Sequence, residues 1–166
     1  MAVFNKILVP HDGSKVSNHA LEYAARIASE NQDSEIILPH VIPSFPISYP
    51  SARRRKMIAA ASHSNLHDIY EELELIASQT LNDLKEETLT GYNKLQIGTH
   101  VIVGGDVFQR IIGYAKKHDV DLIVINSRAT LGSSRNFTKL WVPLGSVSRK
   151  ISETAPCPVL LVRPVV

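Results

Sequence analysis

The amino-acid sequence predicts an α/β fold: a single domain with an open, Rossmann-like parallel sheet and helices on both faces. Five short apolar runs alternate with four amphipathic segments along the 166 residues. Several runs are apolar at successive positions, which is typical of strands buried on both faces. Right-handed helical crossovers between such strands give a doubly wound, five-stranded sheet.

The predicted strands are short and rich in branched residues. They are residues 3–10 (VFNKILVP), 35–42 (EIILPHVI), 95–103 (LQIGTHVIV), 121–126 (DLIVIN) and 158–164 (PVLLVRP). The second, fourth and fifth runs are the most continuously apolar, so we expect these strands to be buried on both faces.

Four segments between the strands carry apolar residues at helical spacing, which places each set on one helix face. The sets are Leu21, Ala24, Ala25 and Ala28; Leu66, Ile69, Tyr70, Leu73, Ile76, Ala77, Leu81 and Leu84; Phe108, Ile111, Ile112 and Ala115; and Leu144, Val147 and Ile151. Asp106 follows a Gly-Gly pair and is expected to be the N-cap of the third helix.

Composition narrows the class of protein. A chain of 166 residues with 44% apolar residues suits one compact domain. Its 18 basic and 16 acidic residues are mixed along the chain apart from the run Arg53–Lys56, so we expect no nucleic-acid partner. No apolar stretch approaches the ~20 residues of a membrane span, and the first residues do not resemble a signal peptide. We therefore expect a cytoplasmic protein without a membrane partner.

Two further groups of residues have a structural interpretation. Cys157 lies in an apolar stretch with no basic neighbour, which is typical of a buried small hydrophobic residue rather than a reactive thiol. His63 and His67 are four residues apart, a spacing that suits a metal. Because no third ligand is evident, a solvated helix face is the better interpretation.

Ligands of open parallel sheets bind beyond the carboxyl ends of the strands. Two long connections, residues 43–61 and 127–142, directly follow the second and fourth strands and so lie at that edge. Loops of this length in compact domains are often binding loops.

The motif VPHDGS, residues 9–14, follows the first strand. Asp12 is placed where a carboxylate accepts hydrogen bonds from a ribose hydroxyl or a base. Alternatively, Asp12 and Ser14 only form a turn and cap the next helix. His11 lacks an identifiable nucleophile or partner, so we assign it no catalytic role.

The motif LGSVSRKI, residues 144–151, is the second candidate. Gly145 lets a ligand approach the backbone, and Ser146 stands where helix amides point outward with the positive end of the helix dipole. The motif is thus either an anion site or an ordinary Gly-Ser helix start. The glycine, serines and arginine at residues 132–135 favour anion binding.

These motifs resemble the universal stress protein family over essentially the whole chain, residues 1–166. KILVPHDGSKVSNHALEYAARIA is similar to the family's opening strand, Asp turn and helix, HVI to the end of its second strand and HDVDLIVI to its fourth. LGSVSRKISETAPCPVLLVRP closely matches the family's closing segment. The resemblance implies the strand order 3-2-1-4-5 and a homodimer formed through the last strand.

The resemblance also implies an adenine-nucleotide site with a divergent phosphate loop. ATP-binding members carry Gly, two residues, Gly, nine residues and Gly-Ser or Gly-Thr after the fourth strand. This chain keeps the spacing from Gly132 to Gly145 only with Arg135 at the middle glycine. A second alignment equates NSRA, starting at Asn126, with the family's GSRG and places a six-residue insertion after it. Arg135 either obstructs the phosphate path or supplies a bidentate phosphate contact.

The other site positions implied by the resemblance match more closely. Pro10 and Asp12 would line the ribose and adenine side, and Val41 would meet adenine through its backbone. Backbone amides would hold the phosphates at Gly132, Gly145, Ser146 and Val147.

Three functional hypotheses follow. The first is a homodimeric stress-response or signalling protein that binds ATP, with or without Mg²⁺, or a related adenine nucleotide, with at most slow hydrolysis. The second is a dimeric interaction module of the same family without nucleotide binding, which would use the 43–61 loop and the last strand. The third, an ATP-using enzyme such as a nucleotidyl transferase, is disfavoured because VPHDGS contains one glycine where such phosphate loops contain several.

Overall fold

The computed structural model describes residues 4–31, 33–44, 66–88, 90–92, 94–127 and 144–163. The strands are β1 (Lys6–Leu8), β2 (Glu35–Ile42), β3 (Gln96–Val103), β4 (Leu122–Asn126) and β5 (Val159–Val162). The helices are α1 (Lys15–Ser29), α3 (Leu66–Thr88), α4 (Val107–Lys117) and α5 (Ser146–Thr154). Strands and helices alternate as the sequence predicts.

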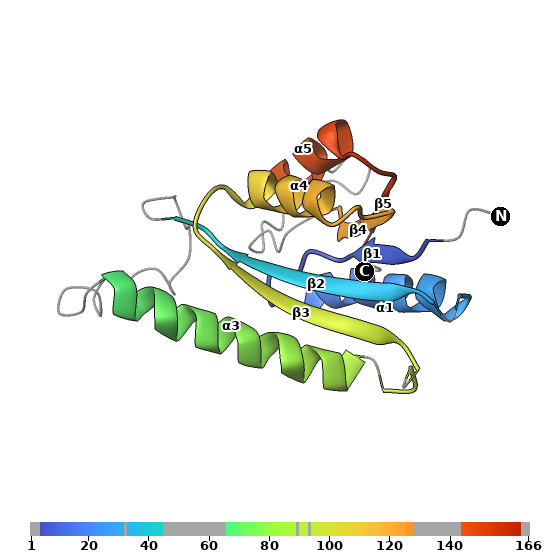
Figure 1. Cartoon of the computed structure of the whole chain (residues 1–166), viewed down its shortest axis with the longest axis horizontal. Coiled ribbons are helices and arrows are strands. Elements are labelled where there is room, and N and C mark those ends of the chain that lie inside the picture. Colours follow the sequence, from blue (N-terminus) through green and yellow to red (C-terminus); the bar gives the residue numbers. More distant parts are fainter. Residues whose placement is uncertain are drawn as a thin grey trace, which may run out of the picture.

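The five strands form one parallel sheet in the order β3-β2-β1-β4-β5 (Figure 1). This order confirms the predicted 3-2-1-4-5 arrangement. The chain winds outward from the central β1 in one direction and then, from β4, in the other. The reversal places the carboxyl ends of β1 and β4 beside each other, the position where open α/β sheets bind ligands.

Helices cover both faces of the sheet (Figure 1). On one face, α1 and α3 pack with a core that includes Ile7, Leu21 and Leu81, and on the other α4 and α5 pack with Leu8, Ile111 and Ile151. Alternate residues of β1 therefore enter opposite cores, as expected for a central strand.

Side-chain caps define the starts of two helices. The Ser14 side chain accepts a hydrogen bond from the Ser17 N–H at the start of α1. The Asp106 side chain accepts one from the Gln109 N–H at the start of α4, which confirms the predicted N-cap.

β1 ends earlier than predicted because of a proline in its neighbour. The N–H groups of Val9 and His11 still donate to the β2 carbonyls of Ile37 and Pro39, at 2.8 and 3.0 Å. Pro39 has no N–H with which to donate back toward β1, so the regular pairing stops at Leu8. The backbone of residues 9–11 remains fixed to β2 beyond the end of the strand.

Three burial predictions need correction. β5 is only half-buried from Val159 to Leu161, because it is an edge strand. Ile76 was assigned to the apolar stripe of α3 but is 51% exposed, and Leu144 is 38% exposed and precedes α5. The buried part of α3 lies instead on Ala77, Leu81 and Leu84.

The minor candidates behave as ordinary surface or packing residues. Cys157 is half-buried, and burial raises the pKa of its thiol, which disfavours the reactive thiolate. His67 is exposed and lies 3.1 Å from Glu71, while His63 is outside the described residues. Within the described ranges, no three His, Cys, Asp or Glu side chains are grouped to hold a metal ion, and no helix has the length and apolarity of a membrane span.

Candidate functional site

The candidate site is the sheet edge where β1, β2 and β4 end and α5 begins. The turn after β1 supplies Pro10 and Asp12, β2 supplies Val41, and β4 supplies Asn126. Hydrogen bonds join these segments in pairs, so their relative positions are fixed by the fold.

Asp12 holds the turn that leads into α1. Its Oδ1 accepts hydrogen bonds from the Ser14 N–H at 3.0 Å and from the Ser17 hydroxyl at 2.7 Å. The turn interpretation of the DGS motif is therefore correct. It does not exclude a binding role, because Asp12 is exposed and both bonds use the same oxygen.

The charged form of Asp12 is favoured. Partial burial tends to raise the pKa of Asp12, but hydrogen bonds from Ser14 and Ser17 outweigh that effect and lower it below its usual value. The side chain therefore presents a carboxylate, which accepts hydrogen bonds from ligand hydroxyl or amino groups.

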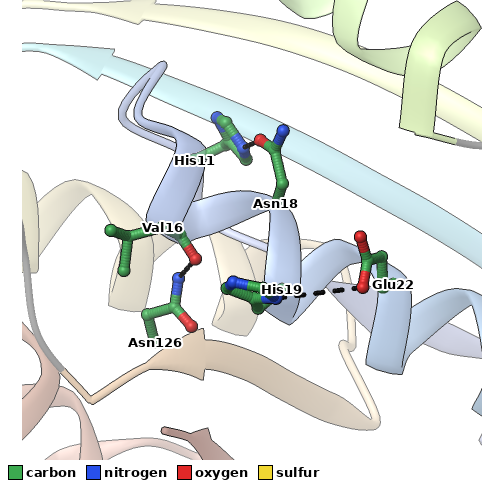
Figure 2. A network of polar contacts seen from close by, with 6 residues as sticks. All are labelled: His11, Val16, Asn18, His19, Glu22 and Asn126. Atoms are coloured by element: carbon green, nitrogen blue, oxygen red, sulfur yellow. Dashed lines mark hydrogen bonds and ion pairs between the residues drawn. The ribbon is translucent and has the colours of Figure 1, made fainter. Parts of the chain in front are cut away.

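His11 is buried, with 3% of its surface exposed, and both ring nitrogens are hydrogen bonded. The Gly13 N–H donates to Nδ1 at 3.0 Å, so the neutral ring carries its proton on Nε2. Figure 2 shows the other contact, in which Nε2 donates to Asn18 Oδ1 at 3.0 Å. Gly13 has φ = 78°, a left-handed conformation that glycine adopts without strain. The ring of His11 thus stabilises a tight turn around Asp12.

His40 connects β2 to the same turn. Its Nδ1 lies 2.9 Å from the backbone carbonyl of His11, to which it donates. Burial lowers the pKa of both His11 and His40. Both rings therefore favour the neutral form in the folded protein.

Asn126, the last residue of β4, is 5% exposed and connects the sheet to α1. Its Nδ2 donates to the Val16 carbonyl in the first turn of that helix (Figure 2). Its Oδ1 is buried and has no hydrogen-bond partner within the described residues. This oxygen is an acceptor suited to an N–H or O–H donor.

The start of α5 is attached to the residue after β4. The Gly145 N–H donates to the Ser127 carbonyl at 2.8 Å, and the Ser148 hydroxyl lies 3.0 Å from the same carbonyl. Gly145 is the N-cap and has no side chain with which to cap the following amides of Ser146 and Val147. Such amides, at the positive end of the helix dipole, suit an anion.

The structure brings together most of the predicted residues. Pro10 is buried directly before the Asp12 turn, and Val41 is half-buried one residue before the end of β2. Gly132 and Arg135, with nearly all of the 43–61 and 127–142 connections, lie outside the described residues.

Sequence reasoning missed the residues that hold the site together. His40 and Asn18 support the His11 segment, and Ser127 and Ser148 position the start of α5. His11 was considered only as a general base. Asn18 is in α1 and His11 is in the turn before it, and no sequence pattern pairs their side chains.

Comparisons with known proteins agree with this architecture. The model of the Universal stress protein family matches residues 4–163. Universal stress protein YxiE of Bacillus subtilis (strain 168) is 32% identical over 161 residues, which cover 97% of this chain and 100% of the relative.

Solved structures share the fold along nearly the full chain. The universal stress protein UspA from Lactobacillus plantarum has a TM-score of 0.70 and 24% identity, covering 98% of this chain and 100% of that one. A universal stress protein in complex with cAMP has a TM-score of 0.61 and 18% identity, covering 99% and 100%. The universal stress protein from Archaeoglobus fulgidus in complex with dAMP has a TM-score of 0.56 and 20% identity, covering 96% and 98%. The family match and the curated relative together establish that the chain belongs to the universal stress protein family.

Proposed function

We propose that this protein binds an adenine nucleotide at the carboxyl edge of the sheet, between the Asp12 turn and the start of α5. ATP, with or without Mg²⁺, is the expected ligand, and the role is in stress response or signalling. The single observation that carries the proposal is the pairing of an exposed carboxylate with a helix N-terminus whose N-cap is a glycine, across the reversal of strand order.

The donors and acceptors on this edge fit the parts of a nucleotide. Asp12 accepts from ribose hydroxyls through the oxygen that does not hold the turn, while the amides of Ser146 and Val147 favour phosphate oxygens. Asn126 offers a buried acceptor to a hydroxyl or amino group. The charges are complementary: the negative Asp12 faces the neutral ribose, and the positive end of α5 faces the anionic phosphate.

Two structural neighbours support an adenine ligand, because their structures are complexes with cAMP and with dAMP. Both ligands contain adenine and one phosphate group, and neither contains a triphosphate. We therefore expect this chain to bind the base and a single phosphate most securely. Whether it also binds the second and third phosphates of ATP depends on the divergent region around Arg135.

The protein is proposed to act by binding rather than by catalysis. The sequence presents no identifiable general base or carboxylate pair for Mg²⁺, and no Walker-type lysine, so hydrolysis of ATP would be slow at most. A cytoplasmic homodimer formed through β5 remains part of the proposal. The half-buried edge of β5 supports it, since unpaired strand edges are commonly protected by association.

Calorimetric titration of the purified, nucleotide-free protein tests the proposal. ATP with Mg²⁺, AMP, cAMP and dAMP are the ligands, and GTP is the control for base specificity. We expect adenine ligands to bind with a micromolar Kd, about −8 kcal/mol, and GTP to bind more weakly. If no adenine ligand gives a binding heat up to millimolar concentration, the proposal is contradicted.

A second candidate function is an interaction module that no longer binds nucleotide. The observation that favours it is Asn126, whose side chain occupies the position of the family's first glycine in one alignment and is fixed to α1. Arg135→Gly separates the two. If the variant binds ATP and the wild type does not, the interaction module is the better description.

A further inference from the structure

His11 lies between two residues of the proposed nucleotide site, Pro10 and Asp12, yet its ring is buried away from solvent. The ring cannot serve as an exposed ligand contact. Its hydrogen bonds instead connect the turn to α1, because Nδ1 accepts from Gly13. Nε2 donates to Asn18 of α1 (Figure 2).

The two contacts require one protonation state of the ring. The Gly13 N–H needs Nδ1 as an acceptor, and only a neutral imidazole with its proton on Nε2 provides it. A protonated ring carries hydrogen on both nitrogens, so Nδ1 would then face the Gly13 N–H with a second donor. Protonation therefore removes one hydrogen bond from the turn and places two donors against each other.

The effect would reach Asp12 through the backbone. Gly13 directly follows Asp12 and has the left-handed backbone that turns the chain toward Ser14. Asp12 Oδ1 accepts from the Ser14 N–H on the far side of that glycine, so a change at Gly13 alters the direction of the carboxylate.

We propose that His11 is a positioning residue for the nucleotide site: its neutral ring fixes the Asp12–Ser14 turn, and its protonation weakens nucleotide binding. The inference rests on the proposed function. It adds a residue without ligand contact and a pH dependence that the Asp12 carboxylate alone would not give.

Titratable neighbours act on His11 from two directions. Asp12 on the same turn favours the protonated ring, whereas His40 on β2 disfavours a second positive charge. On α1 the facing group is the uncharged Asn18. Burial has the largest effect and lowers the pKa of His11, so the neutral form persists until the solution becomes acidic.

Three variants separate positioning from a general structural role. His11→Asn keeps an acceptor near the Gly13 N–H and cannot titrate in this range. Asn18→Asp places a carboxylate against Nε2 and raises the pKa of His11, so it moves the protonation to higher pH without removing the ring. His19→Asn is the matched control, because His19 is next to Asn18 on α1 but its ring lies 3.9 Å from Glu22 and makes no contact with the turn among the described residues.

The experiment measures the Kd for ATP with the full chain between about pH 8 and about pH 5.5. For the wild type and His19→Asn, we expect affinity to fall at acidic pH by about fivefold more than in His11→Asn, the loss associated with about one hydrogen bond. For Asn18→Asp, the decrease should begin at higher pH. Ionisation of the ligand's phosphate is common to all four proteins and cancels in the comparison.

The outcomes distinguish this inference from the proposed function. If ATP binds at about pH 8 and all four proteins share one pH profile, the positioning role is wrong and nucleotide binding stands. If ATP does not bind even there, both are wrong. The ¹⁵N–¹H spectrum supplies a readout without ligand: the Gly13 amide signal should titrate together with the His11 ring in the wild type, and its independence of that ring would overturn the inference.

Discussion

At the scale of single residues, Asp12 combines a structural and a proposed binding role within one side chain. Its Oδ1 accepts from Ser14 and Ser17, and its charge is proposed to serve the ligand. The two roles are separable because the first needs only an acceptor oxygen, whereas the second depends on the negative charge and on the other oxygen.

Asp12→Asn separates them experimentally. The amide keeps an oxygen for the turn, so we expect the free energy of unfolding to change by less than about 1 kcal/mol. ATP affinity should fall about tenfold or more, because hydrogen bonds to a charged acceptor are the stronger ones. Urea denaturation and calorimetry measure the two quantities.

Ser14→Ala is the matched control for Asp12→Asn. It removes the N-cap of α1 and should lower the free energy of unfolding by about 1 kcal/mol. An Asp12→Asn protein with unchanged ATP affinity would remove Asp12 from the binding site.

The neutral histidines His11 and His40 predict a pH-dependent stability. His11 and His40 have pKa values below the ordinary 6.5 in the folded protein, mainly because burial disfavours the charged rings. As the pH falls below that value, the unfolded chain takes up protons that the folded chain does not, so the free energy of unfolding decreases. The contribution of the two histidines to stability is fully present above their unfolded-state pKa and is lost as the pH falls toward their folded-state pKa.

Urea denaturation at a series of pH values tests this sign. We expect midpoints to fall as the pH is lowered from about 7.5 to about 5.5, with a smaller slope in His11→Asn. A wild-type midpoint that rises on acidification over this range would contradict the assignment of neutral, buried rings.

At the scale of secondary-structure elements, α3 illustrates how burial decides the effect of a substitution. Leu81 is 1% exposed and packs in the core on the α1 side, whereas Leu75 on the same helix is 60% exposed. Both are leucines in a helix, so their helix propensities cancel in a comparison of the same substitution.

Leu81→Ala should lower the free energy of unfolding by about 2–5 kcal/mol, because it leaves a cavity in a buried core. Leu75→Ala should change it by less than about 0.5 kcal/mol. Chemical denaturation of both variants tests the comparison, and equal destabilisation would show that the two faces of α3 are misassigned.

Elements were predictable from the sequence where one physical cue dominated. β2 was predicted with its observed bounds, residues 35–42, because a continuous apolar run marks a buried strand. The early end of β1 was not predictable, since it depends on Pro39, a residue of another strand. Ile76 was misplaced because helical spacing alone does not fix the edge of a buried stripe.

The candidate site was predictable where local sequence motifs mark its residues. Asp12 and Gly145 follow recognisable turn and helix-start motifs, and the strand order places those motifs at the same edge. The contacts of His11 with Asn18 and of Asn126 with Val16 depend on three-dimensional packing. No periodicity or motif in one sequence encodes which side chains meet.

At the scale of the whole molecule, β5 is the element through which the proposed homodimer forms. The carbonyl of Pro158 accepts from Ile123 of β4, and that of Val162 accepts from Ser127, the residue after β4. The backbone groups of Pro158 and Val162 therefore face the sheet. Because backbone groups alternate sides along a strand, the N–H and C=O of Leu161 face outward, where a second chain can pair with them.

Leu161→Pro tests the dimer without removing a bond to β4. Proline is tolerated on the outward side of an edge strand, and it deletes the N–H needed for pairing between chains. We expect the wild type to sediment as a dimer and the variant mainly as a monomer. A wild type that is monomeric, or a variant that remains fully dimeric, would contradict pairing through β5.

The central claim is that an adenine nucleotide binds between the Asp12 turn and the start of α5, and ATP titration followed by ¹⁵N–¹H NMR tests it most directly. We predict that the backbone amides of Gly13, Gly145 and Ser146 shift together with one saturation curve, while amides on the exposed face of α3 near Leu75 do not move. Absence of shifts, or shifts confined to other parts of the molecule, would contradict nucleotide binding at this edge of the sheet.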